Sequence, residues 1–91
     1  MLNVSLLWHM HQPCYVNPLT KTALMPWVRL HAVKGYFDMI TMAKRHPDAQ
    51  MVFNLTPVLI QQIVELAEGR VTDLWEEWTR IPARELSPEQ K

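Results

Sequence analysis

Hydrophobic and polar positions follow one another along the chain in an order that switches between strand-like and helix-like spacing. Residues 2–9 (LNVSLLWH) are apolar on both faces except for Asn3 and Ser5, which is typical of a strand covered on two sides. We therefore predict a buried parallel strand at this position. Residues 10–26 contain three prolines and are predicted to form a long loop.

A helix is predicted from about Trp27 to His46. Its apolar residues recur at spacings of three and four, which places them on one helical face. Gly35 inside this segment costs up to about 1 kcal/mol relative to alanine, and the apolar stripe is long enough to outweigh that cost. Pro47 ends the helix. The stripe consists of Val33, Tyr36, Phe37, Ile40 and Ala43.

A second strand and a second helix follow. Residues 49–55 (AQMVFNL) are short and rich in residues that favour strands. Thr56 is the candidate N-cap of the next helix, Pro57 suits its first position, and Gly69 supplies its C-terminal stop. The apolar stripe of this helix consists of Leu59, Ile63, Leu66 and Ala67.

The last part of the chain predicts a short helix and the start of another. Residues 72–80 carry apolar side chains at helical spacing, and we interpret Trp75 and Trp78 as packing residues. The ending SPEQK (residues 87–91) has the serine, proline and glutamine of a capped helix start. Because two strands are too few for an independently stable parallel sheet, we expect residues 1–91 to be the first part of a larger α/β domain.

Composition and charge narrow the class of protein. The 91 residues are 48% hydrophobic and 20% charged, with a net charge of zero, which is a globular composition without the basic face that nucleic acids and anionic membranes require. No apolar run approaches the roughly 20 residues that span a bilayer. Cys14 has no partner for an internal disulfide, and we interpret it as a small apolar neighbour of the segment before it. The first basic residue, Lys21, lies beyond the apolar start, so we expect a cytoplasmic protein without a signal peptide.

Two histidines one residue apart end the first predicted strand, in the segment WHMHQP (residues 8–13). The side-chain period of a strand places His9 and His11 on the same face. The two strands of a βαβ unit end at the same rim of the sheet, so these histidines should meet Asn54, at the end of the second strand. Because α/β proteins bind ligands at this rim, the sequence predicts a ligand site there.

Each candidate residue also has a purely structural interpretation. A strand-end histidine can be a buried polar group bonded to the backbone, whereas two of them beside Gln12 favour a site. Trp27 could belong to the core or could stack on a sugar ring. Asn54 could cap the following turn or bind a ligand hydroxyl. Arg29 and His31 are interpreted as solvated residues of the helix surface.

Three blocks of the chain, in this order and spacing, resemble the N-terminal part of glycoside hydrolase family 57, which includes α-amylases, amylopullulanases, branching enzymes and glucanotransferases. The blocks are LLWHMHQP, MPWVRLHAVKGYFDM and FNLTPVLIQQI, within residues 4–69. The resemblance implies that the chain is the βαβα N-terminal fragment of an incomplete (β/α)7 barrel that acts on α-glucans. It implies a retaining mechanism without metal or organic cofactor. It further implies that His11 lines the sugar site next to the scissile bond, with His9 beside it.

The resemblance places the nucleophilic glutamate and the acid/base aspartate in later motifs, and no segment of this chain matches those motifs. Retaining cleavage needs the two carboxylates roughly 5 to 5.5 Å apart. We therefore expect this chain alone to be inactive and the remainder of the catalytic domain to be its partner. Cys14 stands where an aromatic residue is usual in the family, which changes the expected shape of the sugar site. The acidic residues interpreted as solvated, on helices or a turn, are Asp38, Asp48, Glu65 and Glu68.

The sequence thus predicts a segment of an α-glucan hydrolase or glucanotransferase that supplies part of the sugar-binding rim. His9 and His11 are predicted to hydrogen-bond sugar hydroxyls, with Gln12 and Asn54 assisting and Trp27 stacking. Two alternatives stay open. One is a metal-dependent barrel hydrolase, similar to a deacetylase, in which both histidines bind zinc, although the third ligand of a catalytic zinc ion is not evident. The other is a non-catalytic α/β interaction module with structural histidines.

Overall fold

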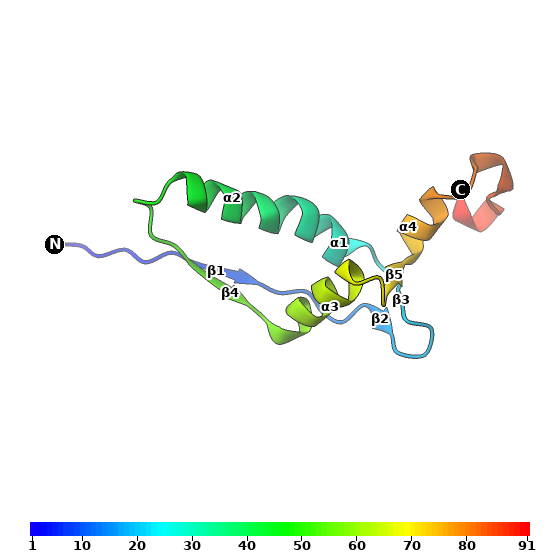
Figure 1. Ribbon diagram of the computed structural model, residues 1–91, viewed down its shortest axis with the longest axis horizontal. Helices are drawn as coiled ribbons and strands as arrows, with labels where there is room; N and C mark the ends of the chain where they lie inside the picture. Colours follow the sequence, from blue (N-terminus) through cyan, green and yellow to red (C-terminus); the bar gives the residue numbers. More distant parts are fainter.

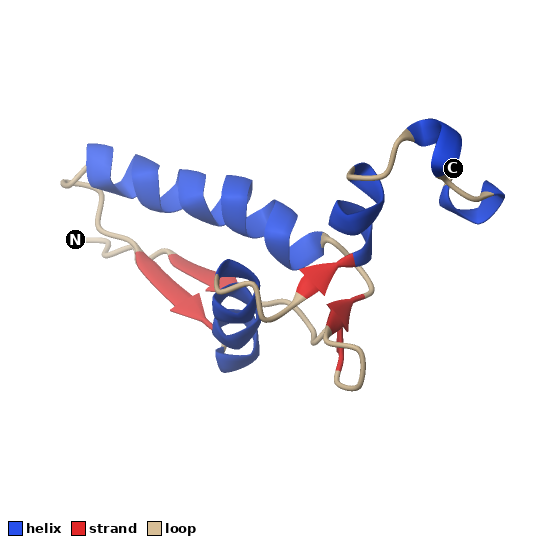
Figure 2. Ribbon diagram, turned by 45° about the vertical axis from the view of Figure 1, so that its right-hand side comes forward, coloured by secondary structure: helices blue, strands red, loops and turns tan.

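Two small sheets organise the chain, which a computed structural model describes over all residues 1–91. In the first sheet, β1 (Leu7–Met10) and β4 (Val52–Leu55) run parallel. The second sheet has the order β2 (Val16–Asn17), β3 (Thr22–Ala23) and β5 (Thr72–Asp73), with β3 antiparallel to β2 and parallel to β5. The prediction of an α/β structure is confirmed, and the observed combination of strands and helices is a mixed one (Figure 2).

Helices connect the strands. The first three helical segments follow one another without a break and form a rod that runs alongside the β1–β4 pair (Figure 1). None of the helices combines the length and the apolar composition that a membrane crossing requires. The helices are α1 (Trp27–His31), the π-helical turn η1 (Ala32–Tyr36), α2 (Phe37–Arg45), α3 (Pro57–Ala67), α4 (Leu74–Thr79) and the 3₁₀ turns η2 (Ala83–Glu85) and η3 (Pro88–Gln90).

The first strand is shorter and more exposed than the pattern of residues 2–9 predicts. β1 begins only at Leu7, because the β1–β4 ladder ends at the hydrogen bond that the Val52 amide donates to the Leu6 carbonyl. Of the four residues in β1, only Met10 is buried, and Leu7 keeps 63% of its surface exposed. The parallel pairing is confirmed, whereas the prediction of a strand buried on both faces is wrong for this chain.

The second sheet was not expected from the sequence. Residues 10–26, predicted to be a loop, contain the β2–β3 hairpin. In its turn, the Asn17 side-chain oxygen accepts hydrogen bonds from the N–H groups of Leu19 and Thr20. Lys21 takes the left-handed conformation in this turn, with φ 56°. Thr72–Asp73, predicted to begin a helix, pair instead with β3 as β5, so α4 starts two residues later. Strands of two residues are too short to show an alternating pattern.

The long predicted helix is confirmed in extent. It ends at Arg45, and the next residue, His46, precedes Pro47. Gly35 lies within η1, where the helix widens to a π-helical turn. The predicted stripe is only partly correct, because Val33 and Phe37 are 67% and 64% exposed, whereas Tyr36 packs against the core together with Met39.

The second predicted helix is α3. Pro57 occupies its first turn, and Gly69 follows its end with φ 69°, a conformation that favours glycine. Thr56 has the expected extended backbone, but its hydroxyl makes no capping hydrogen bond and is buried without a partner. Leu59 is fully buried, while Ala67 at the end of the predicted stripe is exposed.

Little of the chain is buried. The core cluster consists of Met10, Val28 and Leu59, and 8 of the 91 residues are buried in all. The radius of gyration is 17.1 Å, whereas a compact domain of this length has about 12 Å. The chain extends over 62 × 27 × 22 Å, with an extended N-terminal segment reaching away from the sheets (Figure 1). Many of its large apolar side chains therefore stay exposed to solvent.

Candidate functional site

The C-terminal ends of β1 and β4 bring three of the predicted site residues together. His9 is directly opposite Asn54 in the parallel register, and the His9 Nδ1 atom lies 2.8 Å from the Asn54 Oδ1 atom. The rings of His9 and His11 are nearly parallel, with an interplanar angle of 9° and centroids 6.1 Å apart. All three side chains are exposed. The predicted meeting of the two strand ends at one rim is confirmed.

Gln12 lies behind this rim and is half-buried. Its amide nitrogen donates to the Tyr36 hydroxyl over 3.2 Å, and its amide oxygen accepts from the Tyr15 hydroxyl over 3.2 Å. Tyr36 belongs to η1, and its ring lies 5.9 Å from that of His31. Gln12 therefore ties the segment after the histidines to the long helix, a role that the sequence did not indicate.

Trp27 and Cys14 do not join the rim. Trp27 is the first residue of α1, is 42% exposed, and forms no aromatic pair or hydrogen bond with the two histidines. Its stacking on a sugar ring stays a prediction. Cys14 is exposed rather than packed as a small apolar residue, with Sγ 3.9 Å from the Val16 carbonyl oxygen.

Gln62 anchors the chain that follows the rim. This α3 residue is 2% exposed, and its amide bonds three backbone groups. The amide oxygen accepts from the Tyr15 N–H over 2.9 Å, and the amide nitrogen donates to the carbonyl oxygens of Pro13 and Val58 over 3.0 and 3.1 Å. These hydrogen bonds from one buried side chain fix the course of residues 13–15 relative to α3.

Replacing Gln62 with leucine should lower the free energy of unfolding by about 2 kcal/mol, because the variant loses three part-buried hydrogen bonds to the backbone. Amide hydrogen exchange at Tyr15 should be faster in this variant than in the natural protein, because the Tyr15 N–H loses its acceptor. The matched control is Gln61→Leu, since Gln61 is exposed and bonds only Glu65. Equal effects of the two variants would contradict the anchoring role.

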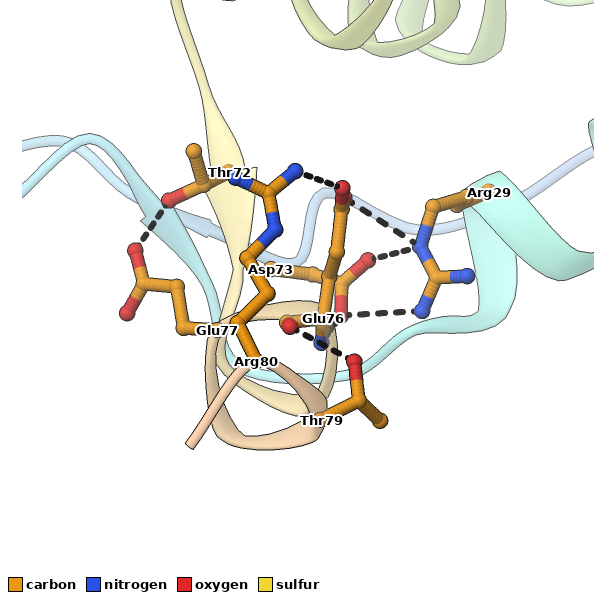
Figure 3. A network of polar contacts seen from close by, with 7 residues as sticks. All are labelled: Arg29, Thr72, Asp73, Glu76, Glu77, Thr79 and Arg80. Atoms are coloured by element: carbon orange, nitrogen blue, oxygen red, sulfur yellow. Dashed lines mark hydrogen bonds and ion pairs between the residues drawn. The ribbon is translucent and has the colours of Figure 1, made fainter. Parts of the chain in front are cut away.

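Arg29 was predicted to be a solvated residue of the helix surface, and this prediction is wrong, because Arg29 pairs with the buried Asp73. Its guanidinium donates two hydrogen bonds to Asp73, from Nε over 2.5 Å and from Nη2 over 3.2 Å. The Arg29 Nε atom also lies 3.6 Å from Glu76, whose other oxygen pairs with Arg80 over 2.6 Å. Figure 3 shows this network between α1 and α4. It joins the first helix to the second sheet across 44 residues of sequence.

Asp73 is the buried carboxylate of the chain, with 1% of its surface exposed. It also caps α4 by accepting the Glu76 N–H over 2.7 Å. Burial alone would raise the pKa of Asp73, but the Arg29 guanidinium and two backbone N–H groups at the start of α4 hold that pKa below its usual value. The sequence does carry one signal for this role, because an aspartate three residues before a glutamate is typical of a helix start.

The acidic residues singled out from the sequence lie on helices or in a turn, as predicted. Asp38 belongs to α2, and Asp48 lies in the turn that precedes β4. Glu65 and Glu68, at the end of α3, pair with Arg70 over 3.8 and 2.6 Å. None of the four lies at the strand ends that carry the histidines.

No group of three or more histidine, cysteine, aspartate or glutamate side chains is arranged to hold a metal ion. The His9–His11 pair therefore lacks a third protein ligand within these 91 residues. A catalytic zinc site on this pair would need that ligand from elsewhere.

The sequence model of glycosyl hydrolase family 57 matches residues 5–85, which is most of the chain. No curated protein and no solved structure was found to match.

Proposed function

Because the chain belongs to glycosyl hydrolase family 57, we propose that the protein containing it hydrolyses or transfers the glycosidic bonds of α-glucans, and that residues 1–91 contribute part of the sugar-binding rim. The observation that carries the proposal is the meeting of His9, His11 and Asn54 at the C-terminal end of a parallel strand pair. This end of the sheet is where parallel α/β folds bind their ligands.

The chemistry of these side chains suits a sugar. Neutral imidazole both donates and accepts hydrogen bonds, as a sugar hydroxyl does, and both histidine rings are exposed to an incoming ligand. In this proposal His11 contacts the sugar next to the scissile bond and His9 contacts a neighbouring hydroxyl. Gln12 positions the segment that carries them, and Trp27 offers a face for stacking.

We further propose that the chain is the N-terminal part of an incomplete (β/α)7 barrel whose other strands pair with the open edges of β1 and β4. The low burial and the large radius of gyration support a segment that packs against further structure. The nucleophilic glutamate and the acid/base aspartate then come from outside residues 1–91. The acidic residues of this chain at helix and turn positions have no part in bond cleavage.

The isolated 91-residue chain should therefore associate with itself, because open strand edges and exposed apolar side chains promote aggregation. Leu7, Phe37 and Val52 each keep more than half of their surface exposed. Sedimentation velocity of this chain alone should show heterogeneous assemblies. A sharp monomer or dimer that unfolds cooperatively would instead support the independent interaction module.

Product analysis of the natural protein tests the proposed reaction. Incubation with malto-oligosaccharides should release or rearrange glucose oligomers, and proton NMR of the first products should show the α-anomer expected of a retaining enzyme. Dialysis against a chelator should leave this activity unchanged. Stoichiometric zinc whose removal abolishes activity would favour the metal-dependent hydrolase, and no action on α-glucans would refute the proposal.

A further inference from the structure

The hydrogen bond between His9 and Asn54 has a direction. The His9 Nδ1 atom faces the Asn54 Oδ1 atom at 2.8 Å. An amide oxygen only accepts hydrogen bonds, so the hydrogen in this contact belongs to His9 Nδ1. In a neutral imidazole, one nitrogen then carries the hydrogen and the other, Nε2, has a free lone pair.

The residue pairs before and after His9 and Asn54 in the parallel ladder hold these two residues opposite each other. His9 lies opposite Asn54 because Trp8 pairs with Phe53 before them and Met10 pairs with Leu55 after them. Directly paired residues in a sheet project to the same face, with side chains close enough to interact. The contact is therefore fixed by the backbone register and does not depend on a flexible loop.

No charged side chain competes for the His9 ring. Its neighbouring titratable group is His11, whose ring lies parallel to it at 6.1 Å. Strand β4, which packs against it, has the sequence VFNL and carries no titratable residue. His9 also forms no ion pair with an aspartate or glutamate. Asn54 is thus the polar partner that decides which ring nitrogen holds the hydrogen.

We propose that Asn54 is a positioning residue that fixes the tautomer of His9, with the hydrogen on Nδ1 and the free Nε2 offered as a hydrogen-bond acceptor to a sugar hydroxyl. The sugar part of this inference rests on the proposed function. Orientation of a ligating histidine through its other nitrogen is a general device in proteins.

The inference restricts the ligand. A free Nε2 lone pair accepts only from a group that donates, such as a sugar hydroxyl. A methoxy group or a fluorine atom at the same place cannot donate, and a carboxylate would meet a lone pair instead of a hydrogen. The site therefore selects a free hydroxyl at the position that reaches His9, and it should reject substrates modified there.

Nitrogen NMR of the natural protein, labelled with ¹⁵N in its histidine rings, tests the tautomer without any ligand. In the neutral form of its ring, His9 should show a protonated Nδ1 and an unprotonated Nε2. Loss of its signals in His9→Gln identifies the residue. Asn54→Leu, of similar size, should shift the hydrogen toward Nε2, whereas Asn54→Asp keeps an acceptor and should keep the hydrogen on Nδ1. The control Asn3→Leu, outside both sheets, should change nothing.

Binding of malto-oligosaccharides to the same variants gives the second readout. Asn54→Leu should weaken binding about tenfold by removing one well-oriented hydrogen bond. A wild-type His9 that carries its hydrogen on Nε2, or an unchanged tautomer in Asn54→Leu, would overturn the inference. If the wild-type protein binds no oligosaccharide, the proposed function fails, while the tautomer measured in the free protein still tests the role of Asn54.

Discussion

Replacement of Asp73 with alanine is expected to lower the free energy of unfolding of the natural protein by about 4 kcal/mol. The change leaves the Arg29 guanidinium without its two hydrogen bonds and removes the cap of α4. Breaking a buried ion pair costs about 3 to 5 kcal/mol, and Arg29 is 30% exposed, so the lower end applies. Loss of a helix cap adds about 1 kcal/mol to the cost. Urea denaturation followed by circular dichroism measures the difference.

Asp48→Ala is the matched control, because Asp48 is exposed and forms no ion pair. Equal stability of the two variants would show that the Arg29–Asp73 pair contributes nothing.

The Asp73 pair also predicts a pH dependence. Because the folded protein holds the pKa of Asp73 below its usual value, the stabilisation is complete above the unfolded pKa of about 3.9. It is lost as the pH falls through the lower folded value. The difference in unfolding free energy between wild type and Asp73→Ala should therefore be constant near neutral pH and shrink in acid. A difference that grows as the pH falls would contradict the assignment.

Replacement of His11 with alanine is expected to reduce turnover on α-glucans about a hundredfold. A side chain that hydrogen-bonds the sugar beside the scissile bond stabilises the transition state more than the bound substrate, and loss of one such polar group typically costs about 10²-fold to 10³-fold in rate. Steady-state kinetics of the natural protein measure kcat and KM separately. The fall should lie mainly in kcat.

His46→Ala is the matched control for His11. His46 is exposed at the end of α2, away from the strand ends, and its replacement should leave the kinetics unchanged. An unaltered kcat and KM in His11→Ala would remove His11 from the site.

The sequence predicts the elements that local spacing specifies. Pro57 and Gly69 bracket α3, and the apolar spacing locates the long helix from Trp27. The pairing of β1 with β4 follows from the βαβ order, which brings His9 to Asn54. These features depend on short stretches of chain and on one general rule of handedness.

The remaining features depend on contacts between distant residues. The bonds of Gln62 to Pro13 and of Arg29 to Asp73 cross 49 and 44 residues of sequence, which no local pattern encodes. The burial of the first strand also depends on contacts with distant parts of the chain, so the sequence pattern alone predicts too much of it. The apolar residues of 2–9 show that the segment is suited to a strand covered on both faces, whereas burial requires covering elements, and residues 2–9 stay exposed in this chain.

A nitrogen NMR titration of the natural protein with malto-oligosaccharides tests the sugar-binding rim most directly, since the chain contains four histidines and only two lie at the strand ends. The ring signals of His9 and His11 should shift together and saturably with added sugar, while those of His31 and His46 stay in place. Unchanged signals of His9 and His11, in a protein that still cleaves the oligosaccharide, would place the sugar elsewhere and contradict the role of this segment.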